Sequence, residues 1–139
     1  MAIQQSAEDY LETILILTHS GMRVKSIDVA AEMNFSRASV STAMKHLREE
    51  GMILVGEHGI ITLTDAGRKI AEEVYHRHRL LTEFLMAIGV NRETAVEDAC
   101  RMEHVISQKT SEMLAVYFQR LKREARRTAP AAAPGSAGS

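Results

Sequence analysis

The chain has 139 residues, 45% of them hydrophobic and 25% charged, with a formal net charge of −1. This length suits one domain and can bury a core, and the lack of an apolar run of about twenty residues excludes a membrane-spanning helix. The first residues lack a basic region followed by an apolar stretch, so we expect no signal peptide. Cys100 is the only cysteine, which excludes an intramolecular disulfide and fits a reducing compartment. We therefore expect a cytoplasmic protein.

The first third of the sequence predicts three helices. Apolar residues recur with a period of 3.6 over residues 7–17, which predicts an amphipathic helix. Ser26 is a favourable N-cap for a second helix, with Asp28 in its first turn. Ser36 is the predicted cap of a third helix, which runs to about Glu50 and ends at Gly51.

The pattern changes after Gly51. Ile53–Val55 and Ile60–Leu63 read as two strands joined by a turn over Gly56–Gly59, which predicts a β-hairpin. Two short helices with a tight turn and a following two-stranded wing are typical of a winged helix-turn-helix. The predicted fold class is therefore mainly α, with a β wing and a helical domain after it.

Three further helices are predicted. The first is capped at Thr64-Asp65 and runs to Ile88, the second is capped by Asn91 and runs to about Ile106, and the last, after a cap at Ser107, covers residues 112–127. The Ala-, Pro-, Gly- and Ser-rich end predicts a disordered tail. We expect a DNA-binding domain over residues 1–70, a helical dimerisation and metal-sensing domain over 71–127, and a tail over 128–139.

The third helix has the composition of a DNA-reading helix. Val40, Met44 and Leu47 share one face and predict the core side, while short and basic side chains occupy the opposite face. Small residues allow close approach to base edges, and basic residues contact phosphates. The predicted DNA contacts are Ser36, Arg37, Ala38, Ser39, Ser41, Thr42, Lys45 and Arg48, with His58 on the wing. The alternative is an ordinary solvated helix face.

Three segments carry residues of the kinds that bind metals. Cys100, Glu103 and His104 are spaced i, i+3, i+4, which places them on one side of a helix, and they combine hard and soft donors. His78 interrupts an apolar stripe, where the alternative is a hydrogen-bonded core histidine. Asp9 and Glu12 are spaced i, i+3 on the first helix, where the alternative is an exposed acidic pair. Because burying several carboxylates without a cation is costly, their convergence favours a metal site.

Three longer stretches carry a resemblance to a known family: Glu8–Ile14, His78–Leu81 and Asp98–Ser107. Through them, the sequence resembles the diphtheria-toxin-repressor family of iron-dependent repressors and manganese transport regulators, over about residues 6–125. The resemblance implies a metal-dependent repressor of metal-uptake genes that binds palindromic operators as a homodimer, with no membrane and no small-molecule substrate. Longer members carry an SH3-like C-terminal domain, so we expect the short architecture here.

The resemblance also implies a ligand set. Asp9 and Glu12 match ligands of manganese-type members, whereas His78, Glu103 and His104 match ligands used across the family. Cys100 matches a position that is Cys in iron-type and Glu in manganese-type members. Ser36, Ala38 and Thr42 match base-contacting positions. The mixed set implies Fe²⁺ or Mn²⁺ as the cofactor, with Zn²⁺, Co²⁺ or another divalent metal able to bind in vitro.

Three other interpretations stay open at the level of sequence. The chain could be a winged-helix regulator that responds to a small molecule without metal. It could be an enzyme in which Cys100 and His104 form a thiolate–imidazolium pair, although the sequence has no Gly-rich phosphate loop, and we expect no enzymatic activity. It could also be a protein-interaction module, which would leave the wing without a role.

Overall fold

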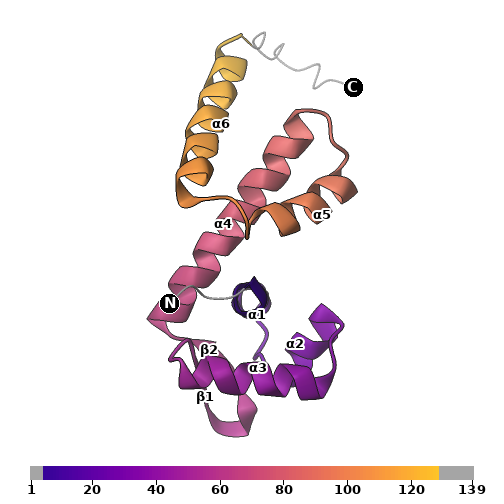
Figure 1. Cartoon of the computed structure of the whole chain (residues 1–139), viewed down its shortest axis with the longest axis vertical. Coiled ribbons are helices and arrows are strands. Elements are labelled where there is room, and N and C mark those ends of the chain that lie inside the picture. The colour runs from indigo at the N-terminus through magenta and orange to yellow at the C-terminus, as the bar shows by residue number, and fades with distance from the viewer. Residues whose placement is uncertain (1–4, 129–139) are drawn as a thin grey trace, which may run out of the picture. The chain divides into compact units, whose positions relative to one another are not determined.

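The computed structural model describes residues 5–128 as two compact units, one ending at Arg79 and the other beginning at Leu80 (Figure 1). The elements in chain order are α1 (Gln5–His19), α2 (Ser26–Met33), α3 (Arg37–Glu49), β1 (Ile53–Val55), the 3₁₀ turn η1 (Glu57–Gly59), β2 (Ile61–Leu63), α4 (Asp65–Ala87), α5 (Arg92–Met102) and α6 (Gln108–Thr128). A mainly helical chain with one antiparallel strand pair after a helix-turn-helix confirms the predicted fold class.

The division between the two units falls inside α4, and the predicted boundary at residues 70–71 stays a prediction. Of the predicted tail, only Thr128 is described, as the last residue of α6, and residues 129–139 lie outside the described part. Within residues 5–128, no helix is long and apolar enough to cross a membrane.

The core of the first unit forms where α1, α2, α3 and the hairpin meet. Leu11 and Ile14 of α1 are fully buried, and so are Val40 of α3 and Ile53 of β1. Met44 and Leu47 are also buried, which confirms the apolar stripe predicted for α3. Because this stripe faces the core, the opposite face of α3 is left in solvent.

Local hydrogen bonds explain where α2 and α3 begin. The Ser36 hydroxyl oxygen accepts a hydrogen bond of 3.1 Å from the Ser39 backbone N–H, which confirms the predicted cap of α3. The predicted cap at Ser26 is wrong, since Ser26 is already the first helical residue of α2 and Lys25 occupies the cap position. The Asp28 carboxylate accepts from the Lys25 backbone N–H at 2.9 Å, so an acid three residues later stabilises this end instead.

The hairpin has the predicted turn. Ile53 pairs with Leu63 and Val55 with Ile61, so the second strand begins one residue later than expected. The turn places His58 in the left-handed region at φ 61°, followed by a glycine at φ 75°. The Ile61 backbone N–H donates to the Val24 carbonyl at 2.7 Å, which anchors the wing to the segment between α1 and α2.

The second unit contains the end of α4 together with α5 and α6. The Phe84 and Phe118 rings meet edge to face with centroids 6.0 Å apart, and Lys122 Nζ lies 3.3 Å from a Glu83 carboxylate oxygen. These contacts pack α6 against the end of α4. Asn91 caps α5 by accepting from the Thr94 N–H at 2.8 Å, as predicted.

In the second unit, two helix boundaries differ from the prediction by several residues. The helix α5 ends at Met102 rather than near Ile106, and residues 103–105 form a turn. Ser107 then accepts from the Thr110 N–H at 3.1 Å, so α6 starts at Gln108, directly after its cap and four residues earlier than expected. An N-cap residue has non-helical backbone angles, so a helix capped by Ser107 cannot be a continuation of α5. The chain therefore leaves helical geometry between Met102 and Gln108.

Candidate DNA interface and metal centre

The outward face of α3 is the candidate DNA interface. The predicted contacts on this helix and at its cap are all exposed: Ser36, Arg37, Ala38, Ser39, Ser41, Thr42, Lys45 and Arg48. The Ser36 hydroxyl donates to Ser39 Oγ at 2.8 Å, and the Thr42 hydroxyl donates to the Ala38 carbonyl at 3.1 Å. These local bonds hold the short side chains close to the helix, so the arginines and lysine project beyond them.

The wing presents His58 and one residue that the sequence analysis missed. His58 is exposed at the hairpin turn. Leu54 is 61% exposed and lies opposite Thr62, on the face of the hairpin that points away from the core. Strand alternation could have revealed it, because Ile53 is buried and the next side chain must point outward. Apolar side chains can contact thymine methyl groups, so Leu54 is a further candidate contact.

The first unit holds three of the predicted metal ligands. Asp9 and Glu12 are half-buried on α1, and one Glu12 carboxylate oxygen is fully buried. The alternative of an exposed acidic pair therefore does not describe them. His78 is half-buried on α4. Glu8 and Arg77, which immediately precede Asp9 and His78, form an ion pair of 3.3 Å between the same two helices.

The second unit holds the other three. Glu103 is 1% exposed and stands at the C-cap of α5, and its Oε1 lies 3.3 Å from His104 Nε2. The Cys100 sulfur lies within 4.8 Å of a Glu103 carboxylate oxygen. Cys100 is on the helix itself, whereas Glu103 and His104 follow its last residue. The predicted placement of all three on one continuous helix is therefore wrong for Glu103 and His104, although the αR angles at Glu103 keep its carboxylate near Cys100.

The donor chemistry of these residues fits a divalent cation. A buried carboxylate next to a buried imidazole is costly to keep in an apolar setting, and a cation is one group that offsets this cost. Carboxylate oxygens and imidazole nitrogens bind Mn²⁺ and Fe²⁺, and a thiolate adds a softer donor. The set Cys100, Glu103 and His104 contains one donor of each kind.

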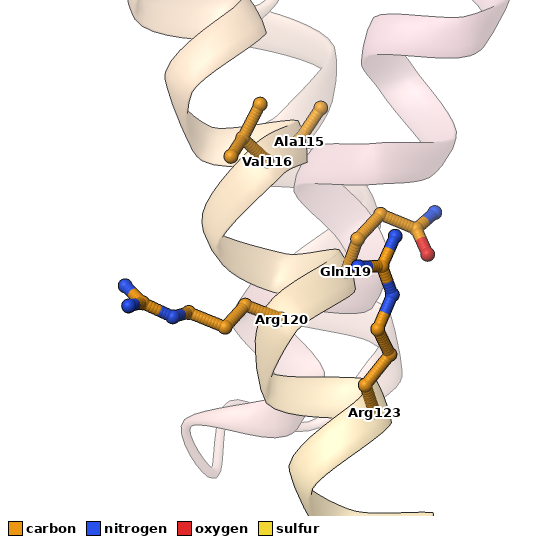
Figure 2. Close-up of a pocket in the computed structure, with 5 residues that line it drawn as sticks. All are labelled: Ala115, Val116, Gln119, Arg120 and Arg123. Atoms are coloured by element: carbon orange, nitrogen blue, oxygen red, sulfur yellow. The ribbon is translucent and has the colours of Figure 1, made fainter.

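A groove on α6 has a different chemistry. It has a volume of about 420 Å³ and is lined by Ala115, Val116, Gln119, Arg120 and Arg123. Figure 2 shows that all five side chains project from this one helix. Because this lining contains no acid, histidine or cysteine, the groove is not a candidate metal site.

Comparisons with known proteins match both halves of the chain. The family model described as "Iron dependent repressor, N-terminal DNA binding domain" matches residues 2–58. The model described as "Iron dependent repressor, metal binding and dimerisation domain" matches residues 64–128. The first match contains α3 and its exposed face, and the second contains His78, Cys100, Glu103 and His104.

Relatives and solved structures agree with these matches. The chain is 30% identical to the uncharacterized HTH-type transcriptional regulator MJ0568 of Methanocaldococcus jannaschii, over 86% of this chain and 98% of the relative. It is 32% identical to the transcriptional regulator MntR of Escherichia coli O157:H7, over 81% of this chain and 73% of the relative. The structure of the manganese regulator SloR matches with a TM-score of 0.73 at 28% identity, over 86% of this chain and 55% of that one. ScaR with bound Zn²⁺ matches with a TM-score of 0.70 at 29% identity, over 81% and 53%. The chain thus spans about half the length of these two solved chains.

Proposed function

The chain belongs to the iron-dependent repressor family of metal-dependent transcriptional repressors, and we propose that it represses metal-uptake genes when Fe²⁺ or Mn²⁺ is bound. The two family models and the MntR relatives confirm the predicted family and the general function of a DNA-binding, metal-dependent repressor. Because these relatives are transcriptional regulators, we do not propose a catalytic role for Cys100 and His104. Binding to operator DNA implies action in the cytoplasm.

The proposal assigns two sets of residues. The proposed metal ligands are Asp9, Glu12, His78, Cys100, Glu103 and His104. The proposed DNA contacts are Ser36, Arg37, Ala38, Ser39, Ser41, Thr42, Lys45, Arg48 and His58.

One observation carries the assignment of the metal centre: the fully buried Glu103 carboxylate, 3.3 Å from the His104 imidazole. A buried carboxylate requires hydrogen bonds or positive charge around it. Glu103 and His104 supply oxygen and nitrogen donors at adjacent positions, inside the segment that matches a metal-binding domain. Carboxylate, imidazole and thiolate together favour Fe²⁺, with Mn²⁺ close behind, because a thiolate is a softer donor than Mn²⁺ prefers.

Three of the proposed ligands, Asp9, Glu12 and Glu103, are acidic. When bound, a divalent cation supplies positive charge that offsets the repulsion among the acidic ligands. Asp9 and Glu12 belong to α1, which packs on α2, α3 and the hairpin. A shift of α1 would therefore also shift α3, the helix proposed to contact DNA. A coupling of about 1–3 kcal/mol between the metal and DNA sites, a typical allosteric magnitude, corresponds to roughly a 5- to 150-fold change in operator affinity.

The symmetry of a homodimer predicts the symmetry of the operator DNA. A homodimer presents two copies of α3, so we propose a palindromic operator whose half-sites lie about 34 Å apart or a multiple of that distance. In each half-site, Ser36, Ala38 and Thr42 would face base edges. Arg37, Lys45 and Arg48 would reach bases or phosphates.

Fluorescence anisotropy with labelled promoter DNA tests the proposal. Wild type is titrated in Mn²⁺, in anaerobic Fe²⁺, in Zn²⁺ and in EDTA, beside Glu103→Ala and the control Glu112→Ala on the exposed surface of α6. We expect metal to tighten binding by wild type and by the control, and Glu103→Ala to bind at saturating metal about as weakly as wild type does in EDTA. A circular-dichroism melt of each variant verifies that it is folded.

Two results would contradict the proposal. If wild type bound equally tightly in EDTA, the metal-independent, small-molecule-responsive regulator would become the better interpretation. If folded Glu103→Ala bound as tightly as wild type at saturating metal, Glu103 would not couple metal to DNA.

A further inference from the structure

An ion pair outside the proposed ligand set joins α1 to α4 within the first unit. Arg77 Nη2 lies 3.3 Å from Glu8 Oε2, although the two residues are 69 positions apart in the sequence. Their side chains are only 16% and 18% exposed, so this is not a solvated surface pair of the kind that contributes little.

The location of the pair connects it to the metal ligands. Glu8 immediately precedes Asp9, and Arg77 immediately precedes His78. Consecutive Cα atoms are 3.8 Å apart, and each helical residue adds a rotation of 100°. The contact between Glu8 and Arg77 fixes the rotation of α1 and α4 about their axes and their positions along those axes. It therefore also fixes the positions of Asp9 and His78, the next residues on the two helices.

Charge explains why such a contact is needed. Glu8, Asp9 and Glu12 place three carboxylates within the first turns of α1, where the helix dipole offsets only part of their repulsion. The core side of α1 packs on α2, α3 and β2. Arg77 adds a positive charge from α4, and a guanidinium remains protonated at any physiological pH.

We propose that Glu8 and Arg77 are positioning residues, which hold α1 and α4 in register so that Asp9, Glu12 and His78 are preorganised before metal binds. This inference rests on the proposed function of those three side chains as ligands. Groups that orient metal ligands through a second layer of contacts typically change metal affinity 10- to 100-fold when they are removed. Neither Glu8 nor Arg77 needs to touch the metal for this effect.

Isothermal titration of the full chain with Mn²⁺ tests the proposal. Glu8→Gln removes the charge with little change in size, Arg77→Gln removes it with a shorter side chain, and we expect each to weaken Mn²⁺ binding about tenfold. Because they share one contact, the double variant should weaken it little more than either single variant. Arg77→Lys, which keeps the charge, should retain most of the affinity. Glu72→Gln makes the same chemical change at an exposed position of α4 and should leave the affinity unchanged.

Thermal melts separate positioning from a purely structural role. If the pair only stabilised the fold, Glu8→Gln would lower Tm equally in EDTA and in Mn²⁺. Positioning predicts that the rise in Tm on adding Mn²⁺ also becomes smaller, because that rise follows metal affinity.

The outcomes distinguish this inference from the proposed function. A wild-type chain that binds no divalent metal would overturn the proposed function, and the inference with it. A wild-type chain that binds Mn²⁺, with both Gln variants binding it equally well, would overturn the inference alone. Losses that simply add in the double variant would show that Glu8 and Arg77 act independently, which also overturns it.

Discussion

Among the glycines of residues 5–128, Gly67, in the first turns of α4, is the one where an added methyl group would meet the closest backbone atoms. Gly67 is buried, and a Cβ there would lie 2.9 Å from the carbonyl carbon of Met52 and 3.3 Å from its Cα, and closer still to its carbonyl oxygen. Non-bonded carbon atoms normally lie 3.5–4.0 Å apart. The obstacle is backbone, so it cannot move aside as a flexible side chain would.

The displaced carbonyl belongs to the junction between the wing and α4. The Met52 oxygen accepts hydrogen bonds of 3.0 Å from both the backbone N–H and the hydroxyl of Thr64. The Thr64 hydroxyl oxygen in turn accepts from the Gly67 N–H at 3.1 Å and so caps α4. Overpacking costs about 1–3 kcal/mol, and one lost hydrogen bond adds about 1 kcal/mol. We therefore expect Gly67→Ala to lower the free energy of unfolding by about 2–4 kcal/mol.

Urea unfolding followed by circular dichroism measures this loss. Wild type and variants are compared in EDTA at one protein concentration, because bound metal and dimerisation both shift apparent stability. Gly56→Ala, in the adjoining hairpin, is the matched control, since its Cβ would meet nothing nearer than the Ile60 carbonyl oxygen at 3.8 Å. Its stability should change by less than about 1 kcal/mol, as expected for Gly→Ala at a compatible position. A Gly67→Ala protein within about 0.5 kcal/mol of wild type would refute the argument from close approach.

Four other substitutions follow from the same structure. Ile14→Ala should cost about 2–5 kcal/mol of unfolding free energy in urea, because its side chain is fully buried; a loss below about 1 kcal/mol would contradict this. Asn91→Ala should cost about 1 kcal/mol in the same assay through the lost cap of α5, and an unchanged midpoint would show that the cap is dispensable. Cys100→Glu should shift the metal that best activates operator binding toward Mn²⁺, whereas an unchanged metal profile would mean that Cys100 is not a ligand. Arg48→Gln should reduce the salt dependence of log K for operator binding by a slope of about 1, and an unchanged slope would exclude a phosphate contact there.

Much of the fold could be predicted because its signals are local. Ser36, Asn91 and Ser107 each accept a hydrogen bond from a backbone N–H three residues later, so the residues that start the helix are neighbours in the sequence. The stripe of Val40, Met44 and Leu47 likewise follows from helical periodicity alone. From these features, the sequence predicted where α3 begins and which of its faces is exposed.

The site was predictable only in part. Residue types and motifs named Glu103 and His104 as ligands, and that assignment stays a prediction. They did not reveal that α5 ends at Met102 and that Glu103 is almost completely buried. Burial depends on the elements that pack over a residue, and the spacing of residues along one helix carries no information about them.

By itself, the sequence determined the order of elements, the caps of α3, α5 and α6, the exposed face of α3 and the family. The tertiary structure alone decided that Gly67 must lack a side chain beneath Met52, and that Glu8 reaches Arg77. The physical reason is separation along the chain. Caps and periodic stripes join residues three or four positions apart, whereas these contacts join residues 15 and 69 positions apart, and only folding brings such residues together.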